Sequence, residues 1–294
     1  MMNDYQQSYQ HLKDMVDRAL SESFCIPGAP HHVLLESMRY SLNAGGKRLR
    51  PVLVLSFCKA CGGDVEAALP VACAIEMVHT YSLIHDDLPC MDNDDLRRGK
   101  PTNHIVYGEC TATLAGDALQ AEAFRTILSA SLPADVRAEC ARLLSQAAGI
   151  EGICGGQQLD MEGEEKSLTR AELLQIHKRK TASMLVAACK MGVVCGAGTP
   201  AQLAAAERYA EAMGLAFQIR DDMLDEISTV EELGKPIGSD AQEKKTTFMS
   251  LYGLEHCQQE VHALTEQAIQ AVSESFENPM FLQELARSME DRRS

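Results

Sequence analysis

The chain has 294 residues, of which 46% are hydrophobic and 23% charged, and both values are ordinary for a globular protein and argue against general disorder. Its formal net charge of -15 at pH 7 argues against nucleic acid as a partner, because phosphate backbones bind to basic surfaces. A small anionic substrate would need local cations or a bridging metal ion to overcome this overall field.

The ends and the cysteines of the chain indicate a cytoplasmic protein without a membrane span. Residues 1–7 are polar and lack the apolar core of a signal peptide, and the most apolar stretch, 184–194, is interrupted by Lys190. The 11 cysteines show no disulfide framework, and the single Cys58-x-x-Cys61 pair has no second CxxC to complete a metal site. We therefore expect free thiols or small buried side chains, which fit a reducing compartment.

Helical periodicity runs through nearly the whole chain, and good helix formers such as Ala, Leu, Met, Glu and Gln dominate it. The clearest helical segments are residues 69–85, 171–194 and 201–224. Clusters of glycine and proline predict loops between such segments, at residues 62–64, 196–200 and 234–238.

The remaining local signals predict an all-α fold with one domain over residues 1–294. Ser167 and Thr169 are suited to cap the helix that follows them. The pattern contains no convincing strand, repeat or linker, and ordinary helix lengths predict about ten or more helices. The segment 184–194 is apolar on nearly all sides, so we expect it to lie in a core or at a subunit interface.

An acidic cluster interrupts the apolar run 217–225. On a helix Asp221 and Asp225 lie one turn apart, Asp222 lies about 100° from Asp221, and Gln218 lies one turn before Asp222. Carboxylates this close repel one another unless cations lie between them, and Mg²⁺ prefers such hard oxygen ligands. A solvated acidic face is the alternative, but the apolar neighbours argue against it.

A second acidic cluster follows the helical segment 69–85 directly. Asp92 comes six positions after Asp86, which is out of phase on a regular helix, although Asp86 and Asp87 are adjacent. Pro89 breaks the regular hydrogen bonding between them and could let the chain bring Asp92 back to Asp86.

Arginines follow this cluster at once. Arg97 and Arg98 carry planar guanidinium groups that suit phosphate oxygens, while Asp94 and Asp95 are expected to face solvent or to act behind the ligands. Salt bridging between neighbouring acids and bases is the alternative. Two acidic clusters, one with adjacent arginines, nevertheless favour a metal–diphosphate site.

Further cations lie in three other segments. Lys47, Arg48 and Arg50 follow a flexible diglycine; residues 178–181 are also basic; and Lys235, Lys244 and Lys245 lie in a Gly/Pro-containing stretch that could close over phosphates and exclude water. Each could also be a solvated basic turn. His79 lies seven positions before Asp86 on the same helical face, where it is either an ordinary histidine or a donor to a diphosphate oxygen.

The motifs, in their order along the chain, resemble those of trans-prenyltransferases of the farnesyl/geranylgeranyl diphosphate synthase family, and the likeness covers nearly the whole chain. They are GGKRLRP at 45–51, YSLIHDDLPCMD at 81–92, DLRRGKP at 95–101, GGQQLD at 155–160, KT at 180–181, FQIRDDMLD at 217–225, and GK, Asp240 and KTT within 234–247.

The resemblance implies an all-α homodimer whose deep central cavity holds about three Mg²⁺ ions on an allylic diphosphate. The positions that match metal-associated residues of the family are Asp86, Asp87, Asp92, Asp221, Asp222 and Asp225. Those that match the allylic diphosphate site are Arg97, Lys180, Thr181, Gln218 and Lys235. Those that match the isopentenyl diphosphate site are Lys47, Arg50, His79 and Arg98. We add Gly46 and Lys245 to the substrate-binding set, and we expect the catalytic set to be Asp86, Asp92, Arg97, Lys180, Asp221 and Lys235.

Product length should depend on the residues just before the first aspartates, which form the cavity floor in related enzymes. Tyr81 lies about 7.5 Å below Asp86 along the helix axis but is rotated by about 140°, whereas Ser82 lies more directly beneath it. By resemblance, an aromatic residue here is similar to the bacterial farnesyl type, and smaller residues accompany longer products. Packing of Tyr81 between helices is the alternative.

Four other functions compete with a farnesyl diphosphate synthase. A geranylgeranyl diphosphate synthase is the nearest. A terpene cyclase would not need an isopentenyl site, and Lys47, Arg50 and Arg98 argue against it. A non-catalytic subunit of a heteromeric synthase should have lost aspartates that this chain keeps. An acidic scaffold protein would not bind Mg²⁺ with a diphosphate analogue.

Overall fold

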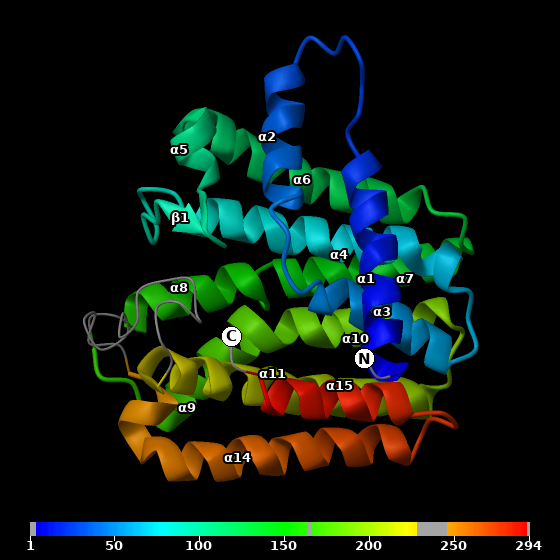
Figure 1. Ribbon diagram of the computed structural model, residues 1–294, viewed down its shortest axis with the longest axis vertical. Helices are drawn as coiled ribbons and strands as arrows, with labels where there is room; N and C mark the ends of the chain where they lie inside the picture. The colour runs from blue at the N-terminus through cyan, green and yellow to red at the C-terminus, as the bar shows by residue number, and fades with distance from the viewer. Residues whose placement is uncertain (1–3, 164–165, 228–245, 293–294) are drawn as a thin grey trace.

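The computed structural model describes residues 4–163, 166–227 and 246–292, and Figure 1 shows them as a helical assembly. The helices of its first half are α1 (Asp4–Glu22), α2 (His32–Leu42), α3 (Leu49–Ala60), α4 (Val65–Asp86), α5 (Asn103–Tyr107), α6 (Glu109–Leu128) and α7 (Ala134–Ala148). Those of the second half are α8 (Ile153–Gly163), α9 (Arg170–His177), η1 (Lys178–Ala182), α10 (Ser183–Cys195), α11 (Pro200–Ile227), α14 (Phe248–Ser273) and α15 (Met280–Glu290). The fold is therefore all-α, as the sequence predicted.

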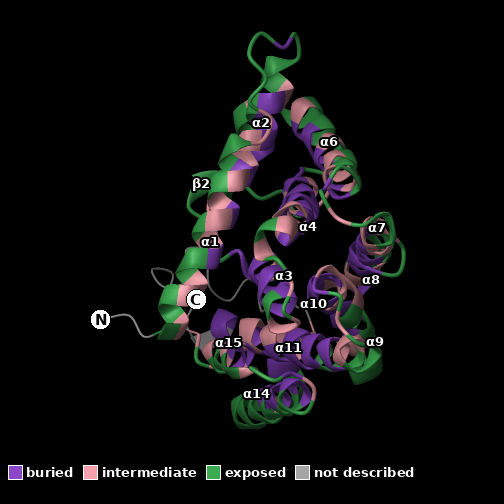
Figure 2. Ribbon diagram, turned by 90° about the vertical axis from the view of Figure 1, so that its right-hand side faces the viewer, coloured by how far each residue is buried: buried purple, intermediate pink, exposed green. Residues whose placement is uncertain are grey.

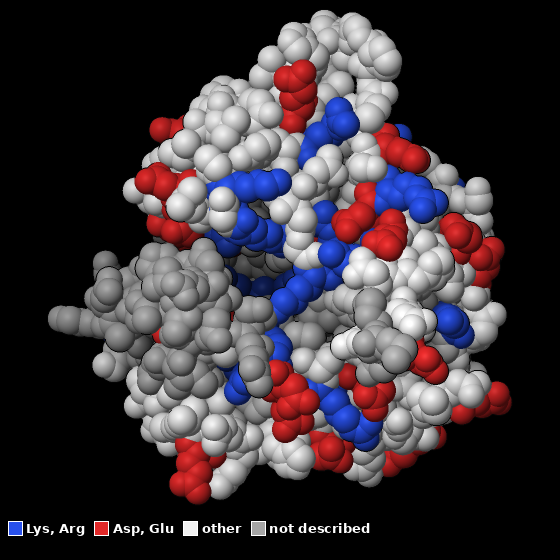
Figure 3. Space-filling view, in the orientation of Figure 1, with Lys and Arg blue, Asp and Glu red and all other residues white. Residues whose placement is uncertain are grey.

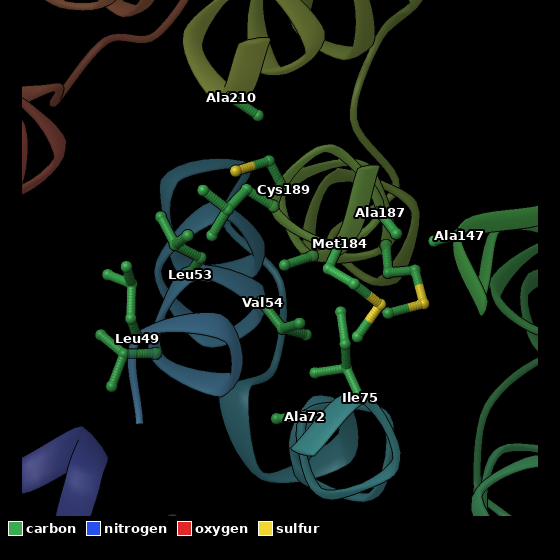
Figure 4. Close-up of a cluster of buried hydrophobic side chains, with 14 of the residues drawn as sticks. Leu49, Leu53, Val54, Ala72, Ile75, Ala147, Met184, Ala187, Cys189 and Ala210 are labelled. Carbon is green, nitrogen blue, oxygen red and sulfur yellow. The ribbon is translucent and has the colours of Figure 1, made fainter. Parts of the chain in front are cut away.

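The hydrophobic core forms between α3, α4, α7, α10 and α11. Figure 4 shows side chains of these helices in one cluster, with Val54 of α3 facing Ile75 of α4 and Met184 of α10. The buried faces of these helices turn toward one another in Figure 2, while α1 and α2 run along one flank. The predicted deep burial of 184–194 is confirmed, since most side chains of α10 are buried here.

A glycine allows α10 to approach α3 closely. A β-carbon on Gly192 would lie 2.4 Å from the carbonyl oxygen of Val54 and 2.7 Å from Cβ of Phe57. Any larger residue would push the two helices apart. This close contact fixes α10 in the core, and α10 in turn holds the segment before it, which carries Lys180 and Thr181.

The predicted helical segment 171–194 is not one regular helix. The structure has α9, a five-residue π-helix η1, and then α10, and the Ser183 N–H donates to the carbonyl oxygen of Lys178. A π-turn closes the backbone over five residues, which apolar periodicity does not encode. The predicted cap is confirmed at Thr169, whose side chain forms a capping box with Glu172.

A small hairpin contradicts the expectation that the chain contains no strand. Strands β1 (Leu96–Arg97) and β2 (Lys100–Pro101) pair antiparallel, and Arg97 lies opposite Lys100. The two turn residues, Arg98 and Gly99, have φ of 53° and 72°, as a tight two-residue turn requires. Strands of two residues are too short to leave an alternating pattern in the sequence.

Helix α4 is long and apolar enough to span a membrane by length and composition, a property that the sequence analysis did not recognise. However, 72% of its most apolar window is buried inside the protein, so within this structure it acts as the central core helix. The cysteines among the described residues are not joined in disulfide bonds in this structure.

Candidate active site

The first aspartate cluster forms where α4 ends. Asp86 is the last residue of α4 and Asp87 is its C-cap. The chain then turns over residues 88–92, which include Pro89, and the Asp92 N–H donates to the carbonyl oxygen of Asp86 at 2.9 Å. The sequence predicted that a break at Pro89 would return Asp92 to Asp86, and the structure confirms it.

Both aspartates at the end of α4 are shielded from solvent, Asp86 partly and Asp87 almost fully. Burial raises the pKa of Asp86 to about 6; Lys180 opposes this increase and Asp92 adds to it. Burial also raises the pKa of Asp87 to about 6, although Arg97 opposes it. A cation placed between these carboxylates would stabilise them in the ionised form.

Arg97 forms the salt bridge that the sequence left as an alternative. Its Nε donates to Oδ1 of Asp87 at 2.5 Å, and its Nη2 lies 3.2 Å from Oδ2 of Asp94. Asp94 and Asp95 are exposed, as predicted. Arg97 is thus held at the edge of the first cluster by two carboxylates.

Gly46 makes room for Arg98. Gly45 and Gly46 have φ of 87° and 122°, which side chains rarely tolerate. A β-carbon on Gly46 would lie 2.7 Å from Cζ of Arg98, and Nη1 of Arg98 donates to the carbonyl oxygen of Gly45. The diglycine and the hairpin turn therefore interlock and present the Arg98 guanidinium beside the residues that follow Gly46.

Arg50 and His79 lie near Arg98, whereas Lys47 lies near Asp221 and Arg292. Burial lowers the pKa of Arg50, and nearby Arg98 lowers it further. The Arg50 Nε is buried without a hydrogen-bond partner. Burial lowers the pKa of His79 well below its ordinary value, and the surrounding arginines add to that effect, so His79 is neutral. Buried, mutually repelling cations are suited to receive an anion.

Arg48 departs from the cluster that the sequence suggested for Lys47, Arg48 and Arg50. Its side chain turns inward, where Nη1 donates to Oε1 of Glu76 at 2.7 Å and Nε donates to Oδ1 of Asp17 at 2.8 Å. Sequence reasoning assigned no role to Glu76 or Asp17, because each is a single carboxylate on an ordinary helix.

A chain of hydrogen bonds connects η1 to the second aspartate cluster. Thr181 Oγ1 donates to Oε1 of Gln218 at 3.0 Å, and Gln218 Nε2 donates to Oδ1 of Asp222 at 3.3 Å. Oδ2 of the buried Asp222 accepts the N–H of Phe248 at 2.9 Å, at the start of α14. Asp222 therefore joins α11 to α14 as well as belonging to the acidic cluster.

Lys180 projects from η1 to α8. Its Nζ lies 2.6 Å from Oδ2 of Asp160, the last residue of the GGQQLD motif, whose role the sequence analysis left open. A β-carbon on Gly156 would lie 2.3 Å from the backbone nitrogen of Lys180, so this glycine lets α8 approach η1. The motif thereby fixes the lysine from two sides.

Asp221 and Asp225 have different surroundings. Asp225 is buried, with 4% of its surface exposed. Asp221 is nearly half exposed, and Nη2 of Arg292, from beyond α15, donates to its Oδ1. The Arg292 guanidinium also lies 3.8 Å from the centre of the Phe217 ring. Sequence reasoning missed Arg292, because 71 positions separate it from Asp221.

Tyr81 and Ser82 lie on α4 below the first cluster. Tyr81 is 5% exposed; its ring packs edge-on against His85, and its Oη lies 3.5 Å from the carbonyl oxygen of Ala148 and 3.9 Å from Sγ of Cys154. Tyr81 thus fills the space between α4 and the connection from α7 to α8. Ser82 Oγ donates to the carbonyl oxygen of His79 at 2.9 Å.

A pocket of about 170 Å³ lies between η1, α8, α11 and the start of α14. Its polar lining comprises Asp160, His177, Lys180, Gln218, Asp222, Thr246 and Thr247. Lys180 also affects the pKa of Asp86, so it relates this pocket to the first aspartate cluster. Figure 3 shows lysine and arginine side chains gathered around a hollow on this face of the molecule.

The donor set fits Mg²⁺ that arrives with a diphosphate. Among residues 4–163, 166–227 and 246–292, no three His, Cys, Asp or Glu side chains already form a metal site. Mg²⁺ commonly keeps waters and takes only one or two carboxylates together with substrate phosphates. Two groups of partly buried carboxylates beside cations provide that arrangement. Lys235 and Lys245, which the sequence assigned to substrate, lie outside the described residues, as does the predicted loop 234–238.

An all-α bundle with two aspartate clusters beside a cationic group defines a prenyltransferase of the farnesyl/geranylgeranyl diphosphate synthase type. The chain belongs to the polyprenyl synthetase family, whose pattern matches residues 31–284. It is 52% identical over 224 residues to the farnesyl diphosphate synthase of Geobacillus stearothermophilus, which covers 75% of each chain. It is 47% identical over 259 residues to the geranylgeranyl diphosphate synthase of Cyanophora paradoxa, which covers 87% of this chain and 86% of the relative.

Solved structures agree with this assignment. A FPP/GFPP synthase from Zymomonas mobilis superposes with a TM-score of 0.87 at 36% identity, over 98% of this chain and 99% of that one. A geranylgeranyl pyrophosphate synthetase from Pyrococcus horikoshii superposes with a TM-score of 0.88 at 31% identity, over 99% and 100% of the two chains. The helical fold described above is thus the isoprenoid synthase fold.

Proposed function

We propose that this protein is a farnesyl diphosphate synthase that condenses isopentenyl diphosphate with dimethylallyl or geranyl diphosphate. The observation that supports a fifteen-carbon product is the position of Tyr81. Its bulky side chain is buried about one and a half turns before Asp86, on the helix that ends at the first aspartate cluster. The relatives named above include synthases of both fifteen- and twenty-carbon products, so the tyrosine is what favours the shorter one.

In this proposal the allylic diphosphate binds between the two aspartate clusters with about three Mg²⁺ ions. Asp86 and Asp92 from the α4 side, and Asp221 from α11, would hold the metal, with Asp87, Asp222 and Asp225 supporting them. Mg²⁺, when bound, supplies positive charge that stabilises the diphosphate leaving group. Burial raises the pKa of Asp86 and Asp87, and this supports the role, because a bound cation would offset the cost of burying their charge.

The cations of the site would hold the two diphosphates apart. Lys180, Arg97, Thr181 and Gln218 border the aspartates and would orient the allylic diphosphate, with Lys235 and Lys245 completing its site. Gly46, Lys47, Arg50, His79 and Arg98 form the separate isopentenyl site. The buried, unpartnered Nε of Arg50 supports this assignment, since a buried donor normally has a hydrogen-bond acceptor and a diphosphate oxygen would supply one.

In the proposed reaction the allylic carbon–oxygen bond breaks before the new carbon–carbon bond forms. The allylic C–O bond breaks, and Lys180 and Arg97 stabilise the negative charge that develops on the departing diphosphate. The double bond of isopentenyl diphosphate, positioned by Lys47, Arg50 and Arg98, attacks the allylic cation. A proton is then lost, which we assign to the departing diphosphate. Water would have to be excluded from the site during this step, because it would otherwise quench the cation.

The growing chain extends toward Tyr81 and Ser82, which we propose as the floor that limits product length. Contacts of Tyr81 with the α7–α8 connection support this role, because they hold its ring in one place. A fifteen-carbon chain would fill the space above the ring. A smaller residue at this position would open space between α4 and α8.

We further propose that the chain acts as a single domain in a cytoplasmic homodimer. One cluster of buried hydrophobic side chains extends from α1 to α15, which supports a single domain. Ile105 and Val106 of α5 and Leu114 of α6 are about half exposed, at 52%, 45% and 51%, and these adjacent helices offer an apolar face to a second copy.

Product analysis tests the farnesyl assignment. Purified protein would be incubated with Mg²⁺, isopentenyl diphosphate and either dimethylallyl, geranyl or farnesyl diphosphate, and the products would be identified by mass spectrometry. We expect fifteen-carbon product from the first two primers and none from farnesyl diphosphate. Accumulation of twenty-carbon product would instead establish a geranylgeranyl diphosphate synthase.

A further inference from the structure

We propose that Arg48 and Glu76 form a positioning pair that aims Lys47 and Arg50 at isopentenyl diphosphate without touching the substrate themselves. The inference rests on the proposed function, because it assigns a role inside the isopentenyl site. It gives a role in substrate binding to Arg48, the inward-facing arginine of the GGKRLRP motif. It gives the same role to Glu76, which lies on α4 outside all the motifs.

The first step of the argument is the conformation of the backbone. Gly45 and Gly46 have φ of 87° and 122°, and Arg48 has φ of 56° in the left-handed region. Three of four successive residues therefore adopt conformations that cost free energy for most side chains. Such a turn keeps its shape only where the surrounding structure holds it, and this turn determines where Lys47 and Arg50 lie.

The Arg48 side chain provides that restraint. Its guanidinium donates to three acceptors on three elements: Oδ1 of Asp17 on α1 at 2.8 Å, the carbonyl oxygen of Leu42 at the end of α2 at 2.6 Å, and Oε1 of Glu76 on α4 at 2.7 Å. Arg48 is 3% exposed and Glu76 is 2% exposed, so the bond between them lies in a medium of low dielectric constant, whereas Asp17 is partly exposed. The rigid guanidinium fork anchors the turn to the core.

The neighbours of Arg48 are oriented by this anchor. Lys47 precedes it and is exposed, and Tyr9 Oη donates to the Lys47 carbonyl oxygen at 2.7 Å. Arg50 lies in the first turn of α3, two residues after Arg48, and its Nε is buried without a partner. The guanidinium at residue 48 thus points inward, while the buried Nε of Arg50, two residues later, has no acceptor within the protein.

Glu76 contributes charge as well as geometry. It is 2% exposed. Burial lowers the pKa of Arg50 and Arg98 and Glu76 opposes that decrease, while at Arg48 the carboxylates of Glu76 and Asp17 outweigh burial and raise the pKa. It also lies three residues before His79 on the same face of α4. One buried carboxylate therefore opposes the mutual repulsion of the arginines while leaving an excess of positive charge for a diphosphate.

A pair that served stability alone would have the same hydrogen bonds, so the test separates stability from substrate affinity. Replacing a buried ion pair by apolar residues of similar size often preserves stability, whereas removing one partner leaves an unpaired charge. We therefore compare the Arg48→Met/Glu76→Leu double variant with Arg48→Lys, which keeps the charge but loses the fork. The matched control is Lys190→Met/Glu207→Leu, an ion pair of 3.1 Å that joins α10 to α11 away from the site.

Wild-type condensation of the two substrates is measured first, and its absence would refute the proposed function whatever the variants do. If wild type is active, we expect the KM for isopentenyl diphosphate to rise by about tenfold in the double variant and by several-fold in Arg48→Lys, with the KM for geranyl diphosphate within about twofold. The control pair should leave both KM values near wild type. The melting temperature of each variant is measured alongside.

An unchanged isopentenyl KM in either variant would overturn the proposal, as would a parallel rise in both KM values. Arg48→Lys decides the question if the double variant does not fold, because it retains a charge for Glu76. The Glu76→Gln variant adds a check on charge: it can still accept a hydrogen bond from Arg48, and its isopentenyl KM should fall between those of wild type and the double variant.

Discussion

A side chain on Gly46 would occupy the space of the Arg98 guanidinium, since its β-carbon would lie 2.7 Å from Cζ of that arginine. These residues come from two separate sequence motifs, the diglycine before α3 and the hairpin turn after α4. Their contact brings the two motifs into one cationic site. The glycine therefore contributes to the proposed isopentenyl site by being small.

Gly46→Ala should weaken isopentenyl binding. The added methyl group would displace the Arg98 guanidinium and strain a backbone with φ of 122°. We expect the KM for isopentenyl diphosphate to rise by about tenfold, while the KM for geranyl diphosphate changes little. The control is Gly28→Ala, where φ is 74° but a β-carbon would meet no atom within 4 Å, so it introduces strain without the collision. Equal effects of the two substitutions would refute this role for Gly46.

Asp86→Ala and Asp221→Ala should each lower turnover by orders of magnitude while the protein stays folded, because each would remove a hard oxygen ligand from the metal–diphosphate complex. Steady-state kinetics and circular dichroism check both parts. Asp94→Ala is the matched control in the first cluster, since Asp94 is exposed and pairs with Arg97 at 3.2 Å. Near-normal turnover of either variant would count against the metal assignment.

Tyr81→Ala and Tyr81→Met should lengthen the product. Removing the ring opens the space between α4 and the α7–α8 connection, where Oη lies 3.5 Å from the carbonyl oxygen of Ala148. Mass spectrometry should then find twenty-carbon or longer chains in both variants. Tyr209→Phe is a control, because Tyr209 is a fully buried tyrosine on α11 that bonds to Leu282, and it should not change chain length. Release of fifteen-carbon product alone by both Tyr81 variants would show that Tyr81 is not the floor.

Protein stability should depend on pH through His177. Burial lowers the pKa of His177 from 6.5 to about 4, with Asp160 opposing and Lys180 adding to the shift. As the pH falls below about 6.5, His177 becomes protonated in the unfolded chain but stays neutral in the folded protein. Its contribution to the free energy of unfolding is therefore complete above pH 6.5 and is lost as the pH falls toward 4. Between pH 7.5 and 5 the loss from this residue should be about 2 kcal/mol.

Urea unfolding of wild type and His177→Phe at the two pH values measures this contribution. The His177 ring stacks on Phe248 at 5.6 Å, so phenylalanine keeps the stacking and removes the titrating group. The variant should lose about 2 kcal/mol less than wild type over the same interval. The same pH dependence in both proteins would assign the acid sensitivity to other groups.

The elements that the sequence predicted well are those with a strong local signal. Helix α4 and the buried face of α10 follow from apolar periodicity. The return of Asp92 to Asp86, six positions earlier, follows from Pro89, which breaks the helix between them. The loop at 62–64 and the Thr169 cap follow from ordinary turn and capping preferences. Each of these depends on residues close together in the chain.

The features that the sequence could not provide depend on tertiary contacts. The π-helix η1 lies where Gly156 presses against the backbone of Lys180, and apolar periodicity contains no trace of it. A left-handed backbone conformation turns the Arg48 side chain inward to Glu76. Of the three neighbouring cations in the sequence, only Lys47 and Arg50 therefore remain candidates for binding substrate. Arg292 reaches Asp221 from 71 positions away, a distance that no local pattern spans.

The dependence of condensation on Mg²⁺ tests the central claim most directly. The rate of fifteen-carbon diphosphate formation from geranyl and isopentenyl diphosphates would be measured with Mg²⁺, after chelation by EDTA, and after Mg²⁺ is restored. We predict condensation with Mg²⁺, its loss in EDTA and its recovery when the metal returns. No condensation with Mg²⁺, or an undiminished rate in EDTA, would contradict the assignment of the two aspartate clusters as a metal–diphosphate site.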